Sequence, residues 1–178
     1  MLIEEEKMHL VGNNVIIRNF EEKDFDSFYR LVKNKSNHDL SGMEYSTDIN
    51  EAKEIFSRYM KIKGSYCIAL KPNSLMVGII ELNERGVTGG LERTRELGFI
   101  IEEKYRRQGL ASEAVDLMIN YSFNELELTE LWAAAEKSNV APQKLLVKHN
   151  FKYIYEVKQE FTFFGGEDNV IKYYLLKQ

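Results

Sequence analysis

The stretch ELGFIIEEKYRRQGLASEAVDLM, residues 96–118, decides the fold. Its first six residues, ELGFII, are typical of a strand, and SEAVDLM, after a short loop, predicts a helix that continues through Asn124. The basic turn RRQGLA between them brings two arginines to a helix N-terminus, where backbone N–H groups have no internal partner and the helix dipole is positive. Such an end attracts phosphate. Gly109 removes a side chain where a phosphate must approach the backbone, and Ala111 keeps the next turn small.

Two better-known phosphate-binding loops are excluded. The chain contains neither G-x-x-x-x-G-K-[ST] nor G-x-G-x-x-G. From the residues alone, a charged loop that caps a helix and binds nothing remains an alternative interpretation of RRQGLA.

The remaining sequence predicts a mixed α/β chain in the order β-α-α-β-β-β-α-β-α-β-β. NVIIRNF near Val15 is typical of a strand, and the apolar spacing of residues 25–32 predicts a helix. A polar segment, 36–48, is expected to be a loop, and a helix follows Asp48. SYCIAL and LMVGIIEL form a predicted hairpin, LWAAA a strand and NVAPQKLLVKHN a short helix. KYIYEVKQEFTFF, the turn GGEDN at 165–169 and VIKYYLL complete the chain as a long hairpin.

Composition limits the classes of function. The 178 residues carry a net charge of −4, which disfavours nucleic acid as the main partner. No run approaches the ~20 apolar residues of a membrane span, and the acidic start lacks an apolar signal core. We therefore expect one domain over residues 1–178, cytoplasmic, monomeric or homodimeric. The single Cys67 is interpreted as a small buried hydrophobe, and the histidines show no metal-ligand spacing.

Several segments together resemble the GNAT superfamily of N-acetyltransferases. Arg106-x-x-Gly109-x-Ala111 matches the family signature [QR]-x-x-G-x-[GA], between the family's fourth strand and third helix. MVGIIELN is similar to its third strand, and LWAAAEKSNVAPQKLLVKHNF to its fifth strand and fourth helix. The chain is most similar to the RimJ/RimL-like group of ribosomal-protein N-terminal acetyltransferases, from about Val15 to the end. The resemblance implies one α/β (α+β) domain, with a mixed, mostly antiparallel twisted sheet of about six to seven strands and about four helices.

The resemblance also implies acetyl-CoA as cosubstrate and no metal. The end of the fourth strand would pair with the pantetheine arm, and the following N–H groups would hold the pyrophosphate. An asparagine after the fifth strand would bind the pantetheine amide, and an N–H near Phe99 or Ile100 would polarise the thioester carbonyl. The implied cofactor-binding residues are Phe99, Ile100, Ile101, Arg106, Arg107, Gln108, Gly109, Leu110, Ala111 and Asn139.

The catalytic groups are less defined. The amine that attacks the thioester must be neutral, so a carboxylate that takes its proton assists the reaction. Glu96 is the candidate base, because relatives carry an acidic residue on this strand; Glu81 on the neighbouring strand is the reserve, and water is a third possibility. Pro142 and Leu146 replace the serine and tyrosine found in relatives, which leaves no side-chain acid for the departing thiolate.

Two functions of different classes follow. The first is an acetyl-CoA-dependent N-acetyltransferase that acts on a primary amine, either a protein N-terminus or a small molecule. The second is an acyl-CoA-binding sensor or interaction module with little or no turnover, which the replaced serine and tyrosine positions favour.

Overall fold

The computed structural model describes residues 7–159 and 169–178. Within these ranges the chain forms eight strands, five α-helices and two single-turn 3-10 helices. The strands are β1 (His9–Val11), β2 (Val15–Arg18), β3 (Ser65–Leu70), β4 (Met76–Glu84), β5 (Thr94–Ile101), β6 (Glu130–Glu136), β7 (Lys152–Gln159) and β8 (Asn169–Lys177). The helices are α1 (Phe25–Val32), α2 (Lys35–Ser41), α3 (Ile49–Tyr59), α4 (Leu110–Asn124) and α5 (Val140–Lys148), with 3-10 turns at Glu22–Asp24 and Glu103–Tyr105.

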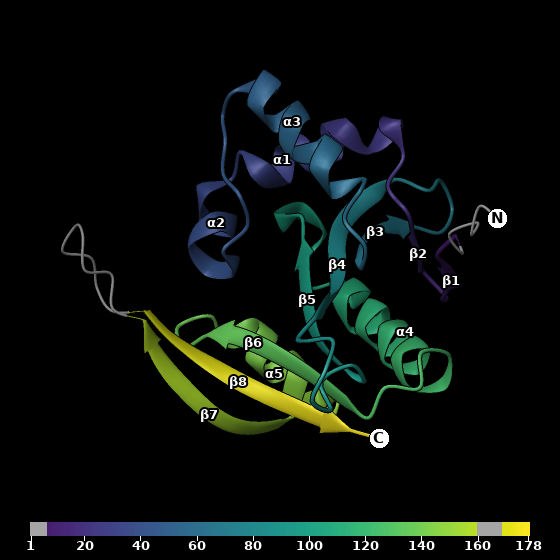
Figure 1. The fold of residues 1–178 in the computed structure, drawn as a ribbon. Coiled ribbons are helices and arrows are strands. Elements are labelled where there is room, and N and C mark those ends of the chain that lie inside the picture. The colour runs from purple at the N-terminus through teal and green to yellow at the C-terminus, as the bar shows by residue number, and fades with distance from the viewer. Residues whose placement is uncertain (1–6, 160–168) are drawn as a thin grey trace.

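All eight strands belong to one sheet in the order β1-β2-β3-β4-β5-β6-β8-β7. Every neighbouring pair is antiparallel except β5 and β6, which run parallel. Figure 1 shows the sheet twisting from β1 and β2 near the N-terminus to the long β7–β8 hairpin at the opposite end. The single parallel pair requires the crossover helix α4 between its strands.

Helices cover both faces of the sheet and create two cores. The first buries β2, β4 and β5 side chains against α4 and α5, with Val115, Met118 and Leu146 at 1% exposure or less. The second packs α1 and α3 against β3 and β4 through an aromatic cluster around Phe28 and Phe56, whose ring centroids lie 5.0 Å apart. Both faces of β4 are therefore buried, each in a different core.

The predicted fold class is confirmed, with two elements more than expected. The segment 36–48, expected to be a loop, contains most of α2. The Asn34 side chain accepts a hydrogen bond from the Ser36 N–H at the start of α2, and Gly42 ends it at φ 70°. These capping residues make a short helix where polar composition alone indicates a loop. The additional strand β1 has only three residues, too few for a hydrophobic period.

The expectations for Cys67 and for the final hairpin can be compared with the structure. Cys67 is fully buried in the second core, and burial raises the pKa of its thiol, so its interpretation as a small hydrophobe is confirmed. The turn of the final hairpin, GGEDN, lies outside the described residues except for Asn169. The described parts of that hairpin, β7 and β8, pair as expected.

Candidate active site

The site begins where β5 and β6 separate. Thr94–Leu97 pairs in parallel with Glu130–Ala133. Beyond this, β5 continues to Ile101 beside β4, whereas β6 continues to Glu136 beside β8. Among the described strands, none pairs with β5 from Gly98 onward on the side that faces β6. This unpaired edge gives a ligand backbone groups to bind.

The direction of those backbone groups follows from one hydrogen bond. The Glu102 N–H donates to the Val77 carbonyl of β4 at 2.8 Å. Because N–H groups alternate sides along a strand, the N–H groups of Phe99 and Ile101 point away from β4 into the gap, whereas that of Ile100 points toward β4. Phe99 and Ile101 are thus the residues of β5 whose main chain faces the gap.

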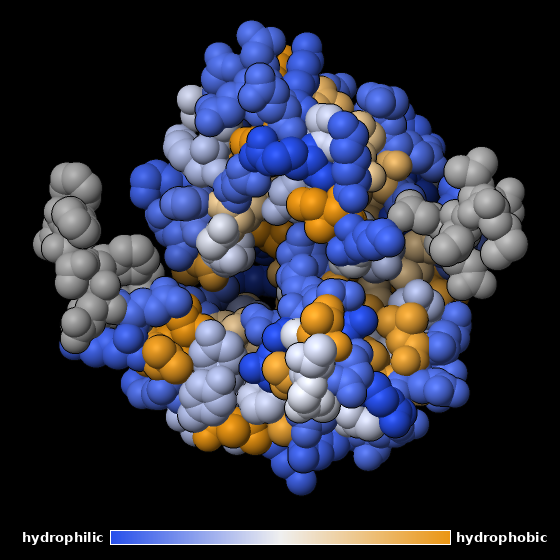
Figure 2. All heavy atoms as spheres, viewed as in Figure 1, coloured by the Kyte–Doolittle hydropathy of each residue, from blue (hydrophilic) through white to orange (hydrophobic). Residues whose placement is uncertain are grey.

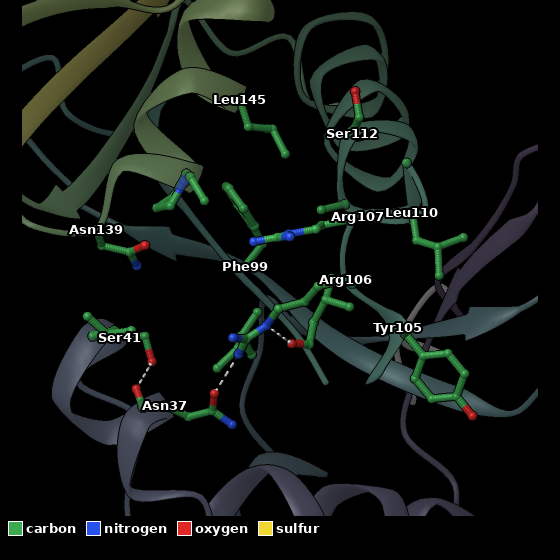
Figure 3. Close-up of a pocket in the computed structure, with 17 residues that line it drawn as sticks. Asn37, Ser41, Phe99, Tyr105, Arg106, Arg107, Leu110, Ser112, Asn139 and Leu145 are labelled. Carbon is green, nitrogen blue, oxygen red and sulfur yellow. Dashed lines mark hydrogen bonds between the residues drawn. The ribbon is translucent and has the colours of Figure 1, made fainter. Parts of the chain in front are cut away.

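A cleft of about 440 Å³ occupies this gap. Figure 2 shows the surface hollowed between the part of the molecule that contains α2 and the part that contains β6 and β8. The cleft is lined by residues of α2, β5, the turn before α4, the first residues of α4 and the first turns of α5 (Figure 3). It therefore contacts both helices that flank the separated strands.

The turn before α4 leaves a helix N-terminus open to the cleft. Arg107 and Gly109 both adopt positive φ, 61° and 81°. Gly109 is the residue before the first turn of α4, and no side chain accepts a hydrogen bond there. A Cβ built at Gly109 would meet nothing within 4 Å, so the space beside it is free for a ligand. Exposed N–H groups at a helix start suit a phosphate group.

The two arginines of the turn differ in their surroundings. The Arg106 guanidinium donates to the Ile101 carbonyl at 2.9 Å and to Asn37 Oδ1 of α2 at 2.8 Å. Arg107 has no hydrogen-bond or ion-pair partner within the described ranges, and its side chain extends across the cleft (Figure 3). Arg107 therefore has both its donors and its positive charge free for an anion, whereas Arg106 already donates to two neutral acceptors of the protein.

Most residues that the sequence predicted for cofactor binding line this one cleft. They are Phe99, Ile100, Ile101, Arg106, Arg107, Gly109, Leu110, Ala111 and Asn139. Gln108 is not among them, because its side-chain amide turns back to donate to the Lys104 carbonyl at 3.2 Å. Sequence reasoning missed the α2 residues that also line the cleft, since that segment was expected to be a loop: Asn37, Leu40 and Ser41.

Asn139 precedes the first turn of α5 and lines the cleft opposite β5. Its side-chain amide makes no hydrogen bond to the described residues and lies at the cavity wall in Figure 3. An unpaired amide offers both a donor and an acceptor to a ligand. Asn139 is thus suited to a ligand that itself carries an amide.

A second, smaller cavity of about 140 Å³ adjoins the cleft. It shares Ser41, Phe99 and Ile100 with the first cavity. Its other lining residues are Gly42, Met43, Tyr59, Ile79, Glu81 and Gly98. The two cavities therefore meet at the end of β5, where strands β5 and β6 have separated.

Glu81 is the carboxylate of the second cavity. Burial raises the pKa of this carboxyl above its ordinary value, although hydrogen bonds from Ser65 at 3.2 Å and from Asn83 act in the opposite direction. Burial, followed by the charges of Glu81 and Glu44, raises the pKa of the neighbouring Tyr59 to about 12. A half-buried carboxylate with a raised pKa, lining a cavity, is a common feature of catalytic sites.

Glu96, the first-choice base from the sequence, lies outside both sets of lining residues. It shares a sheet face with Glu81, because β5 and β4 pair Glu96 with Asn83 and Gly98 with Glu81. Its Oε2 lies 4.0 Å from Arg85 Nε, and the Arg85 guanidinium stacks on the Trp132 ring. Glu96 is thus held toward β6, away from the cavity that contains Glu81.

Sequence reasoning gave His149 no functional role, but it connects the two helices beside the cleft. It follows α5 and is 8% exposed; its Nδ1 lies 2.7 Å from Asp116 Oδ1, and its Nε2 lies 2.8 Å from Ser112 Oγ. Ser112 and Asp116 lie one turn apart on α4. Because no sequence motif joins these positions, only the fold brings them together.

The positions where relatives carry serine and tyrosine provide no acid here. Pro142 lines the cleft, and Leu146 is 1% exposed in the first core. The described residues contain no group of three His, Cys, Asp or Glu side chains that could hold a metal ion. No helix among them is long and apolar enough to cross a membrane.

Comparison with known proteins defines the family. Residues 14–152 match the family model described as Acetyltransferase (GNAT) domain. The chain therefore belongs to the GNAT family of acetyltransferases. It is an acetyl-CoA-dependent N-acetyltransferase that uses acetyl-CoA as cosubstrate.

Individual relatives agree with this assignment. The uncharacterized N-acetyltransferase YnaD of Bacillus subtilis is 25% identical over 79% of this chain and 81% of its own length. Spermidine N(1)-acetyltransferase of Escherichia coli is 24% identical over 90% of this chain and 85% of its own length. A GNAT-family acetyltransferase from Bacillus anthracis superposes with a TM-score of 0.82 at 22% identity, over 96% of this chain and 98% of that one. Spermidine N-acetyltransferase from Vibrio cholerae, solved with CoA and spermine, gives a TM-score of 0.75 at 19% identity, over 92% and 95%.

Proposed function

We propose that the chain acetylates the terminal primary amine of a small aliphatic molecule by direct attack of that amine on the acetyl-CoA thioester. The observation that carries this proposal is the meeting of two cavities at Phe99 and Ile100. The larger has the open helix N-terminus, the unpaired edge of β5 and the polar side chains that suit the CoA arm. The smaller contains a single carboxylate, that of Glu81.

Different residues of the larger cavity would bind different parts of the cosubstrate. The α4 N-terminus with Arg107 faces the pyrophosphate, and the Asn139 amide faces the pantetheine amides. The main chain of Phe99 and Ile101 pairs with the pantetheine arm as a further strand would. The Phe99 N–H, which points into the gap, is the donor placed to stabilise the negative charge that develops on the thioester oxygen.

The acceptor approaches from the smaller cavity. The amine nitrogen bonds to the carbonyl carbon, and the carbon–sulfur bond breaks. Glu81 takes the proton that the amine must lose, directly or through water, because its raised pKa brings it closer to the working pH than an ordinary glutamate. The thiolate takes a proton from solvent, since Leu146 occupies the position of the family's tyrosine.

The size and lining of the smaller cavity favour an unbranched amine. At about 140 Å³ it accommodates an amine and a short methylene chain, with Met43, Ile79 and Ile100 as apolar walls. An α-amino group carries a side chain and a carbonyl on the adjoining carbon, which makes a protein N-terminus wider. The RimJ/RimL-like resemblance implies such an N-terminus, whereas the acidic Glu81 in this cavity favours a cationic small molecule.

A panel of acceptors tests this choice. Thiol release from acetyl-CoA is measured with spermidine, 1,4-diaminobutane, butylamine and a peptide with an N-terminal serine. We expect the aliphatic amines to have a kcat/KM at least about tenfold above that of the peptide, which corresponds to ~1.4 kcal/mol in the transition state. A preference for the peptide would contradict the aliphatic acceptor, and no turnover with any amine would contradict the proposed function itself.

A further inference from the structure

We propose that Arg106 is a positioning residue for the amine acceptor, whereas its neighbour Arg107 acts on the cosubstrate. This inference rests on the proposed acetyl transfer to an amine. It assigns different functions to two adjacent residues of the same type in the same turn. The structure distinguishes them by what each guanidinium contacts.

Arg106 joins the cofactor turn to α2. Its Nε donates to the carbonyl of Ile101, the last residue of β5, at 2.9 Å. Its Nη2 donates to Asn37 Oδ1 at 2.8 Å. Figure 3 shows both bonds, with the Arg106 side chain directed toward α2. A guanidinium used in this way fixes a distance between two elements.

Asn37 is the junction that receives this contact. It is 3% exposed, and its side-chain Nδ2 donates to the Leu31 carbonyl of α1 at 3.0 Å. Its own carbonyl accepts a hydrogen bond from Ser41 Oγ one turn later, at 2.6 Å. The contact of Arg106 therefore extends through Asn37 to the end of α2.

The end of α2 forms one side of the wall that the two cavities share, opposite Phe99 and Ile100. Ser41 lines both cavities, while Gly42 and Met43 line only the acceptor side. Without the Arg106 guanidinium, Asn37 Oδ1 would be buried without its donor, which is unfavourable enough to shift the helix. A shift of this wall changes where the amine stands relative to the thioester. A misplacement of about 1 Å can reduce a rate by about a hundredfold.

The contacts that would hold the pyrophosphate of the cosubstrate do not depend on that wall to the same extent. The open N–H groups at the start of α4 and the free Arg107 side chain belong to the turn itself. Loss of the Arg107 charge should therefore weaken acetyl-CoA binding. Loss of the Arg106 side chain should instead affect the acceptor.

Steady-state kinetics of Arg106→Gln and Arg107→Gln test this division. We expect Arg106→Gln to lower kcat/KM for the amine about ten- to a hundredfold while the KM for acetyl-CoA changes by less than about threefold. We expect Arg107→Gln to raise the KM for acetyl-CoA about tenfold with little change in the amine KM. Arg106→Lys, which keeps the positive charge and one donating nitrogen, should recover part of the loss. The reverse pattern, or a rise in acetyl-CoA KM alone in Arg106→Gln, would overturn the proposal.

Two controls separate positioning from general damage. Asn37→Ala should reproduce the acceptor defect of Arg106→Gln, and the double variant should be no worse than either alone. Lys35→Gln, which removes an exposed ion pair with Asp39 on the same helix, should leave all constants within about twofold. Additive losses in the double variant would mean that the two residues act separately, against the proposal.

Amide hydrogen exchange needs no turnover, so it tests the role of Arg106 independently of the proposed function. Amide hydrogen exchange over residues 37–42 should be faster in Arg106→Gln and in Asn37→Ala than in the wild type, and unchanged in Arg107→Gln. If the wild type acetylates no amine, the proposed function fails and the exchange still decides whether Arg106 holds α2. Equal exchange in all four proteins would refute that link.

Discussion

The Glu81 carboxylate lies over Gly98, its partner on the adjacent strand. A Cβ built at Gly98 would stand 3.6 Å from Glu81 Oε2, and both residues line the smaller cavity. The absence of a side chain at Gly98 thus leaves the carboxylate facing the space where we place the amine. This relationship is the reason that we prefer Glu81 to Glu96 as the base.

Replacing Glu81 should impair the chemical step. Glu81→Gln removes the proton acceptor but keeps the size and the hydrogen-bonding capacity of the side chain. We expect kcat to fall about 10²- to 10⁴-fold, with the dissociation constant of acetyl-CoA unchanged within about twofold. Thiol release and calorimetric titration measure the two quantities.

Glu96→Gln is the matched control, because it makes the same change on the same sheet face outside the cavity. We expect its kcat to stay within about threefold of wild type, since the Glu96 carboxylate lies beside Arg85. If Glu96→Gln causes the larger loss, the first choice made from the sequence is correct and Glu81 is not the base.

The pH dependence of stability follows from the raised pKa of Glu81. A carboxyl whose pKa is higher in the folded state binds its proton more tightly there than in the unfolded chain. Its contribution to stability is complete below the unfolded pKa and is lost as pH rises through the folded pKa. We therefore expect Glu81→Gln to unfold at a higher urea concentration than wild type at pH 8, and this advantage to disappear toward pH 4. A variant less stable than wild type at pH 8 would show that burial does not destabilise the charged form.

Filling the smaller cavity should affect the acceptor alone. Gly98→Val adds a β-branched side chain that β5 tolerates but that projects toward Glu81. We expect kcat/KM for the amine to fall at least about tenfold while acetyl-CoA still raises the melting temperature as in wild type. Gly98→Ala should have a smaller effect, because 3.6 Å is an ordinary contact distance. An equal loss of acetyl-CoA binding would place Gly98 in the cosubstrate site instead.

Gly109 should be needed for both conformation and binding. Its φ of 81° costs an L-residue about 1–2 kcal/mol, so Gly109→Ala should lower the free energy of unfolding by that amount. The methyl group of the alanine also enters the space left for the pyrophosphate. We expect the variant to lose most of the thermal stabilisation that acetyl-CoA gives the wild type. Full stabilisation by acetyl-CoA in Gly109→Ala would show that the phosphate does not approach this residue.

His149 should stabilise mainly through packing rather than through its contact with Asp116. The Asp116 side chain is 62% exposed, and pairs with an exposed partner contribute little. We expect Asp116→Asn to change the free energy of unfolding by less than about 1 kcal/mol, and His149→Ala, which opens a buried space between α4 and α5, to cost about 2 kcal/mol. Urea titrations compare the stabilities of the two variants, and equal losses would mean that the contact with Asp116 dominates.

The sequence predicted the turn before α4 and the position of Asn139 better than the contacts that other elements add to the candidate site. RRQGLA identified the turn because glycine and helix-start chemistry are local properties, and LWAAAEKSN placed Asn139 after a strand. Local patterns do not show which side chains meet across strands or helices. Alternation put Glu96 on the correct face, but the choice between Glu96 and Glu81 depends on which part of that face α2 and α3 leave open. For the same reason, the bond between Arg106 and Asn37, 69 residues apart, had no signal in the sequence.

The meeting of the two cavities at Phe99 is tested most directly by a bisubstrate ligand. CoA joined through an acetyl bridge to the terminal nitrogen of spermidine would occupy both cavities at once, and titration calorimetry compares its affinity with that of CoA alone. We expect the adduct to bind at least about a hundredfold more tightly to the wild type, and this gain to be lost in Gly98→Val. An adduct that binds no better than CoA would contradict an aliphatic-amine site at the end of β5.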